Sequence, residues 1–123
     1  MSAPSLMVLV AGPYRSGTGD DPAKMAANLA RLESVTLALF RAGHLPLIGE
    51  WLALPLLKQA GSTQAGDAAY QEICYPVAHR LLERVDAVLR LPGASAGADG
   101  DVRRAQARGL PVYTALEQVP GIG

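Results

Sequence analysis

Cysteine is nearly absent from this sequence. Cys74 is the single cysteine among 123 residues, so the chain cannot close a disulfide within itself. Small proteins that fold in oxidising compartments usually depend on disulfides. The sequence therefore favours a reducing, cytoplasmic location.

Aromatic residues and net charge are also scarce. The chain has one Trp and one Phe, and its eleven basic side chains are balanced by eleven acidic ones. A surface for single-stranded nucleic acid needs aromatic rings on which bases stack, and a general binder of DNA, RNA or anionic membrane needs a basic face. The composition supplies neither, so we expect neither DNA nor RNA nor a membrane as a partner.

Long hydrophobic runs are missing as well. The first apolar run, residues 6–11, is too short for a signal or membrane segment, and no basic stretch precedes it. We therefore expect a complete, soluble chain. The two histidines, His44 and His79, have no partners at metal-ligand spacing, so the sequence predicts neither a metal nor another cofactor.

Apolar sequence is plentiful enough for one globular core. Half of the residues are hydrophobic and 18% are charged, which is typical of a folded domain. No repeat or linker divides the chain. We expect a single domain over residues 1–123.

Short apolar runs alternate with helical periodicity. The runs predict strands at residues 6–11, 44–48, 86–91 and 110–113. Spacings of three and four predict helices at residues 21–42, 51–58, 68–84 and 102–108, with a kink or fresh start at Pro76 and loops at 60–67 and 95–100. Strands separated by helices pair in parallel through right-handed crossovers. We predict an α/β fold, a doubly wound, Rossmann-like parallel sheet of about four to five strands with helices on both faces.

A glycine-rich turn follows the first predicted strand, at the edge where open α/β sheets bind ligands. Its residues are Gly12, Pro13, Tyr14, Arg15, Ser16 and Gly17. Backbone amides, a hydroxyl and one guanidinium suit a phosphate, so we expect a nucleotide or sugar phosphate here. Thr18 stands where a P-loop has its lysine, and the dinucleotide pattern G-x-G-x-x-G is absent, so a kinase or NTPase is not indicated.

More polar residues fall at the same edge of the predicted sheet. Ser95, Gly97, Asp99 and Asp101 follow the third strand, and Glu50 and Trp51 follow the second. Carboxylates beside a phosphate site suit chemistry at a sugar carbon, and the Trp51 ring would cover a nucleobase, unless it lies in the core or an interface. Asp99 and Asp101 do not share a helix face, and periodicity does not choose between them. Alternatively both cap the helix, whose dipole would keep a carboxylate at its start ionised.

Several short motifs, in order along the chain, carry a resemblance. They are A-G-P-Y at residues 11–14, Asn28, G-H-L-P-L at 43–47, V-D-A-V-L-R-L-P-G at 85–93, S-A-G-A-D at 95–99 and G-L-P-V at 109–112. This pattern resembles the nucleoside 2-deoxyribosyltransferase-like superfamily, and most closely a bacterial branch of it. The resemblance implies a flavodoxin-like, usually oligomeric protein that cleaves or exchanges the N-glycosidic bond of nucleosides or nucleoside monophosphates through a carboxylate nucleophile.

The resemblance also assigns the catalytic residues. The family motif has a serine, a glycine two residues on and an acid six residues on, which are Ser95, Gly97 and Asp101 in this chain. Asp101 is thus expected to be the nucleophile, with Asp99 as its competitor, and Ser95 and the first turn are expected to hold the phosphate. Tyr14 is expected to replace the strand-one tyrosine of the family.

Three departures from the family leave two functions open. Asp101 stands in place of a glutamate, Leu9 in place of the tyrosine, and no carboxylate occurs near Ala78 or His79, where a second acid is expected. The first function is an N-glycosidase or deoxyribosyltransferase-like enzyme. The alternative is a non-catalytic protein of the same fold that binds or senses a nucleotide or sugar phosphate. The resemblance and the apolar segment 51–57 predict a homodimer or homotetramer in either case.

Overall fold

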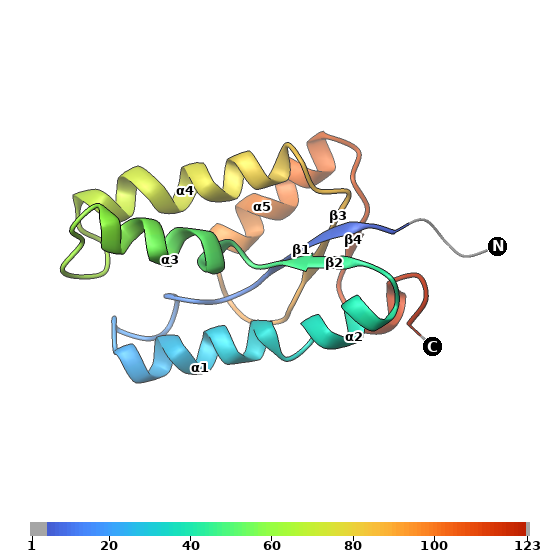
Figure 1. The fold of residues 1–123 in the computed structure, drawn as a ribbon, viewed down its shortest axis with the longest axis horizontal. Coiled ribbons are helices and arrows are strands. Elements are labelled where there is room, and N and C mark those ends of the chain that lie inside the picture. The colour runs from blue at the N-terminus through green and yellow to red at the C-terminus, as the bar shows by residue number, and fades with distance from the viewer. Residues whose placement is uncertain (1–4, 123) are drawn as a thin grey trace.

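The computed structural model describes residues 5–122 and shows a parallel sheet between two layers of helices (Figure 1). The strands are β1 (Met7–Ala11), β2 (Leu45–Leu47), β3 (Ala87–Arg90) and β4 (Val112–Tyr113), in the order β2-β1-β3-β4 and all parallel. This order belongs to the flavodoxin-like type of doubly wound sheet. The predicted fold class is confirmed.

The helices alternate with the strands along the chain. They are α1 (Pro22–Glu33), α2 (Thr36–Arg41), α3 (Gly49–Gln59), α4 (Ala68–Leu82) and α5 (Ala96–Ala107), and a short 3₁₀ helix, η1 (Leu116–Gln118), follows β4. None of the helices between residues 5 and 122 is long and apolar enough to cross a membrane.

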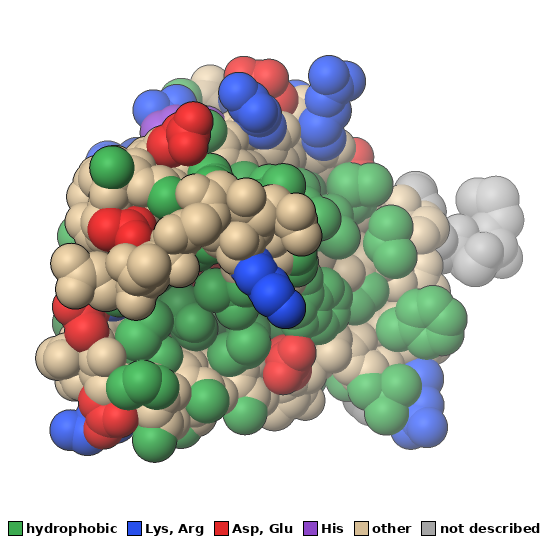
Figure 2. Space-filling view, turned by 60° about the vertical axis from the view of Figure 1, so that its left-hand side comes forward, with side chains coloured by type: hydrophobic (Ala, Val, Ile, Leu, Met, Phe, Trp, Pro, Cys, Tyr) green, Lys and Arg blue, Asp and Glu red, His purple; other side chains and the backbone are tan. Residues whose placement is uncertain are grey.

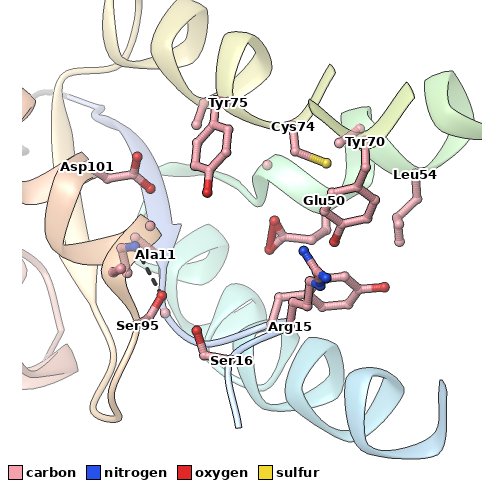
Figure 3. A pocket seen from close by; sticks show the side chains of 18 of the residues that line it. Ala11, Arg15, Ser16, Glu50, Leu54, Tyr70, Cys74, Tyr75, Ser95 and Asp101 are labelled. Atoms are coloured by element: carbon pink, nitrogen blue, oxygen red, sulfur yellow. Dashed lines mark hydrogen bonds between the residues drawn. The ribbon is translucent and has the colours of Figure 1, made fainter. Parts of the chain in front are cut away.

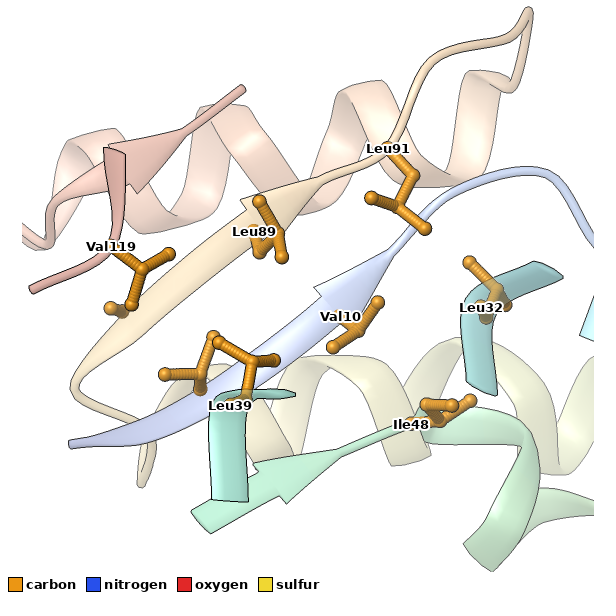
Figure 4. Close-up of a cluster of buried hydrophobic side chains, with 9 residues drawn as sticks. Val10, Leu32, Leu39, Ile48, Leu89, Leu91 and Val119 are labelled. Carbon is orange, nitrogen blue, oxygen red and sulfur yellow. The ribbon is translucent and has the colours of Figure 1, made fainter. Parts of the chain in front are cut away.

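The sheet buries a separate core on each face, because successive strand residues point to opposite sides. On one face, Val10 and Leu89 pack against Leu32 of α1 and Leu39 of α2 (Figure 4). On the other, Leu9 and Val88 pack against Leu82 of α4 and against Ala98 and Ala105 of α5. Val8, Val88 and Leu89 are fully buried, so the central strands are covered on both faces.

The single helix predicted for residues 21–42 is wrong, because it is two helices that break after Glu33. The hydroxyl of Ser34 donates to the carbonyl of Arg31 at 2.6 Å, and the hydroxyl of Thr36 donates to that of Glu33 at 2.7 Å. Such side-chain bonds to the backbone compete with helical hydrogen bonding.

The loop predicted at residues 95–100 is also wrong, because α5 begins at Ala96 and not at residue 102. Ser95 is its N-cap, and the Ser95 hydroxyl accepts the Ala98 N–H at 3.1 Å. Gly97 and Gly100 lower the helix propensity of this turn, so the sequence pattern did not predict a helix there. At Pro76, where a kink or a fresh start is expected, α4 continues as one helix, so a fresh start does not occur.

The carboxyl ends of the strands all face the left side of the molecule in Figure 1. The chain leaves β1 toward β2 on one side, while β3 lies on the other, so the strand order reverses between β1 and β3. Doubly wound sheets bind ligands in the crevice outside such a reversal. The turns after β1, β2 and β3 meet at this point.

Candidate functional site

A cavity of about 410 Å³ lies at the carboxyl end of β1, enclosed by α3, α4 and α5. Of the predicted site residues, it is lined by Gly12, Tyr14, Arg15, Ser16, Glu50, Ser95, Gly97 and Asp101. Pro13 and Gly17 line a neighbouring cavity, and Trp51 and Asp99 line neither. The turns after β1, β2 and β3 therefore line one cavity together. Two of the predicted site residues, Trp51 and Asp99, lie outside it.

Asp101 points into this cavity from α5 (Figure 3). It lies three residues after Ala98 and four before Ala105, both of which are buried against the sheet, so all three share one face of the helix. Burial raises the pKa of Asp101 to about 6, although the positive charges of Arg104 and Arg90 oppose this. The expectation that the helix dipole keeps this carboxylate ionised is wrong, because α5 starts at Ala96 and Asp101 lies beyond its first turn.

Asp99 is on a different face of α5, outside the cavity. Its side chain is 60% exposed and accepts a hydrogen bond from Arg90 Nη2 at 2.9 Å. Arg90 also donates to the carbonyl of Gly93, so this ion pair fastens the loop between β3 and α5. Asp99 is thereby the weaker candidate for the reacting acid, and neither aspartate is the N-cap.

Glu50 brings a second carboxylate into the cavity, from the first turn of α3 (Figure 3). Burial raises its pKa to about 7, and the negative charge of Asp101 adds to the effect. The sequence placed Glu50 at the site only as a substrate contact. Its position directly after β2, at the edge where the other turns meet, was the signal that could have identified it as a second acid in the cavity.

Trp51 does not cover the cavity. Its indole N–H donates to Glu33 of α1 at 2.8 Å, and 38% of its surface is exposed. The residue neighbours Glu50 in sequence, but consecutive helix residues point about 100° apart, so only one of them faces the cavity. The predicted contact of Trp51 with substrate is not supported.

Arg15 lines the cavity, but its charge is already engaged. Its Nε lies 2.6 Å from Asp20 Oδ1 and its guanidinium stacks over the ring of Tyr70, 5.4 Å from the centroid. The Asp20 partner raises the pKa of Arg15 further. Gly66 leaves room for this arrangement, since a Cβ there would lie 2.5 Å from Arg15 Nη2. Arg15 is therefore held at the end of the cavity where Tyr70 lies, which we call the tyrosine end.

Ser16 and Ser95 mark the opposite end of the cavity (Figure 3). The Ala98 N–H is bonded to the Ser95 hydroxyl, but the N–H groups of Ala96 and Gly97 have no acceptors within α5, so this end offers donors to an anion. Gly12 lies beside it for a different reason. A Cβ on Gly12 would lie 2.9 Å from Leu32 Cδ2, so a larger residue there would force the Leu32 side chain of α1 to shift.

The α4 wall of the cavity was missed by the sequence analysis. Tyr70, Cys74 and Ala78, spaced by four residues, and the neighbouring Tyr75 line it. Burial raises the pKa of Tyr14 and Tyr70, and that of the Cys74 thiol to about 11, so Cys74 is not a thiolate nucleophile at neutral pH. The spacing of four was the available signal, but it equally fits residues packed in a core.

Within residues 5–122, no three His, Cys, Asp or Glu side chains lie close enough together to hold a metal ion. His44 is buried at the opposite end of the sheet and bonded to backbone. The chain matches no family model, no curated protein and no solved structure.

Proposed function

We propose that this protein cleaves or exchanges the N-glycosidic bond of a nucleoside or nucleotide, as a relative of the nucleoside 2-deoxyribosyltransferase-like superfamily. One observation carries the proposal. Asp101 from α5 and Glu50 from α3 direct two partly buried carboxyl groups into one cavity, and burial separates their pKa values, to about 6 and about 7. Paired acids with different pKa values are typical of glycoside cleavage.

We assign Asp101 as the nucleophile because the resemblance puts it at that position, and its lower pKa agrees with this role. In the first step a carboxylate oxygen of Asp101 forms a bond to the anomeric carbon of the sugar while the bond from that carbon to the base nitrogen breaks. Glu50, in its protonated form, gives its proton to the leaving base. The products are the free base and a sugar ester of Asp101.

The second step restores both acids. A water molecule attacks the anomeric carbon, the ester bond to Asp101 breaks, and Glu50 takes a proton from the water. If another base attacks instead, the same steps give base exchange. The first step requires an ionised Asp101 with a protonated Glu50, and the second step regenerates that state, so the rate should peak between pH 6 and 7.

The two ends of the cavity fit the two ends of a nucleotide. Leu54, Tyr14 and Tyr70 offer apolar and aromatic surface for a base at one end. Ser16, Ser95 and Gly97 offer hydroxyl and amide groups for the phosphorylated end of the sugar at the other. In Figure 3 Glu50 lies between the two ends and Asp101 lies on the side of Ser95, so the glycosidic bond would lie between these two acids.

Binding or sensing without catalysis remains the second candidate. It is favoured by the aspartate in place of a glutamate, because a side chain shorter by one methylene must reach the anomeric carbon, and a displacement of about 1 Å costs roughly a hundredfold in rate. The same cavity would serve both functions.

Base release from a panel of ribo- and deoxyribonucleosides and their 5′-phosphates tests the proposal. Chromatography of the folded protein with each compound should show a free base for at least one of them, and none with Asp101→Asn. Binding of a compound by calorimetry without release from any of them would establish the sensor instead. No release and no binding would overturn both.

A homodimer or homotetramer is part of the proposal. Exposed apolar side chains gather on α3 and the neighbouring α4, where Trp51, Leu52, Leu56 and Tyr75 are 38–57% exposed, and Figure 2 shows a broad hydrophobic area on one face. A second copy would cover such a surface. Sedimentation should show a dimer or tetramer at micromolar concentration, and a monomer there would contradict it.

A further inference from the structure

A second cavity of about 420 Å³ adjoins the serine end of the main one. It lies between the turn after β1, helix α1 and the start of α5. Ser16, Ser95 and Ala96 line both cavities, so they form a shared boundary. A ligand in the main cavity can therefore extend past the two serines into the second.

The two cavities differ in charge. Asp20, Glu50 and Asp101 line the main cavity, where Arg15 is the one basic lining residue and is paired with Asp20. The second cavity adds Pro13, Gly17, Asn28, Arg31 and Ala94 to the boundary residues, and no carboxylate is among its described lining residues. An anionic group of a ligand is therefore favoured in the second cavity and disfavoured in the first.

Arg31 is held at this cavity by a chain of hydrogen bonds. Its Nη1 donates to Asn28 Oδ1 at 3.1 Å, and Asn28 Nδ2 donates to the carbonyl of Tyr14 at 2.8 Å. Asn28 thus links the arginine to the turn that borders both cavities. Within residues 5–122 the ion pairs are Arg15–Asp20 and Arg90–Asp99, so Arg31 has no carboxylate partner there. Its remaining N–H groups are available to a ligand.

We propose that the second cavity is a subsite for the outer phosphate of a 5′-diphosphate, with Arg31 as the cation that binds it. The proposal rests on the proposed function, because it places the sugar in the main cavity and the inner phosphate at Ser16 and Ser95. Arg31 and Asn28 line only the second cavity, so a phosphate bound at Ser16 and Ser95 would not reach them. A second phosphate would contact them. The substrate class is a nucleoside 5′-diphosphate or a compound that contains one.

Calorimetry with the Asp101→Asn variant tests the subsite without turnover. The 5′-diphosphate of a nucleoside should bind roughly tenfold more tightly than its 5′-monophosphate, because one further charge-assisted contact is made. Arg31→Ala added to this variant should abolish the difference and leave binding of the monophosphate within about twofold. Arg80→Ala, which changes an exposed arginine of α4, is the matched control and should change neither value.

Inorganic pyrophosphate separates failure of the subsite from failure of the proposed function. If pyrophosphate binds and Arg31→Ala abolishes its binding while no nucleoside compound binds, the anion subsite stands and the N-glycoside proposal fails. Equal affinity for the mono- and diphosphate, or a preference for the diphosphate that survives Arg31→Ala, would overturn the subsite. Failure of both pyrophosphate and every diphosphate to bind would also overturn the subsite.

Discussion

The two ends of the sheet treat their polar side chains differently. At the amino end, His44 accepts the Leu6 N–H at Nδ1 and donates from Nε2 to the carbonyl of Pro120, while Asp86 accepts the Met7 N–H. At the carboxyl end, Asp101 and Glu50 are partly buried and bond to no other residue among those described. Paired groups at one end hold the chain together. Unpaired acids at the other end oppose folding, an arrangement that is frequent at ligand-binding and catalytic sites.

Removing the charge of one carboxyl-end acid is the largest expected effect. Asp101→Asn should lower the rate of base release at least about a thousandfold, since an amide cannot act as the nucleophile. Asp99→Asn is the matched control, because this exposed aspartate lies two residues away and outside the cavity. Its rate should stay within a few-fold of wild type. Equal losses in the two variants would break the distinction between them.

Removing a paired group at the amino end should affect folding and not activity. His44→Ala leaves the Leu6 N–H and the Pro120 carbonyl without their partner, which should lower the free energy of unfolding by about 2 kcal/mol. His79→Ala, the control, changes the other histidine and should cost below about 0.5 kcal/mol. Urea denaturation measures both. An unchanged stability for His44→Ala would show that this end is not held as described.

The dependence of stability on pH gives the smallest effect and sharpens the comparison. The pKa of Glu50 is about 7 in the folded protein against an ordinary 4.5, so between these values the folded chain keeps a proton that the unfolded chain has released. Stability should therefore fall as the pH rises through this window. The fall is expected to be on the order of 2 kcal/mol, allowing for partial exposure.

Glu50→Gln should reduce this pH dependence to the part that Asp101 contributes below about pH 6 and should raise stability at pH 7, as followed by urea denaturation at half-unit steps of pH. Glu33→Gln changes an exposed glutamate of α1 and should leave the slope as in wild type. A wild-type stability that rises between pH 4.5 and 7 would mean that Glu50 is not desolvated in the folded protein.

The sequence predicted the architecture well because periodicity and burial have the same cause. Runs such as residues 6–11 and 86–91 are apolar since both faces of a parallel strand are covered, and Pro46 correctly indicated an edge strand. The errors came from local hydrogen bonds. The hydroxyls of Ser34 and Thr36 divide a helix that periodicity continues, and the Ser95 cap starts a helix inside a stretch rich in glycine.

The site was harder to predict because it depends on which way side chains turn. Glu50, Ser95 and Asp101 follow strands, so their positions in the sequence predicted that they lie at one edge of the sheet. Which of Asp99 and Asp101 faces the cavity depends on the rotation of α5 about its axis, which the sequence did not determine. The engagement of Arg15 by Asp20 and Tyr70 depends on the path of the turn, which composition does not reveal. Arg31 is held at the second cavity by its hydrogen bond to Asn28, and no sequence motif predicts this contact.

The edge strand β2 limits how copies of this protein can meet. It has three residues, and since the Leu45 N–H turns inward to Leu6, the neighbouring Pro46 places its nitrogen, which has no hydrogen, on the open side. A foreign strand that docks there finds a missing donor at the centre of so short an edge. Growth of the sheet from one molecule into the next is thereby discouraged, and association is left to the helices.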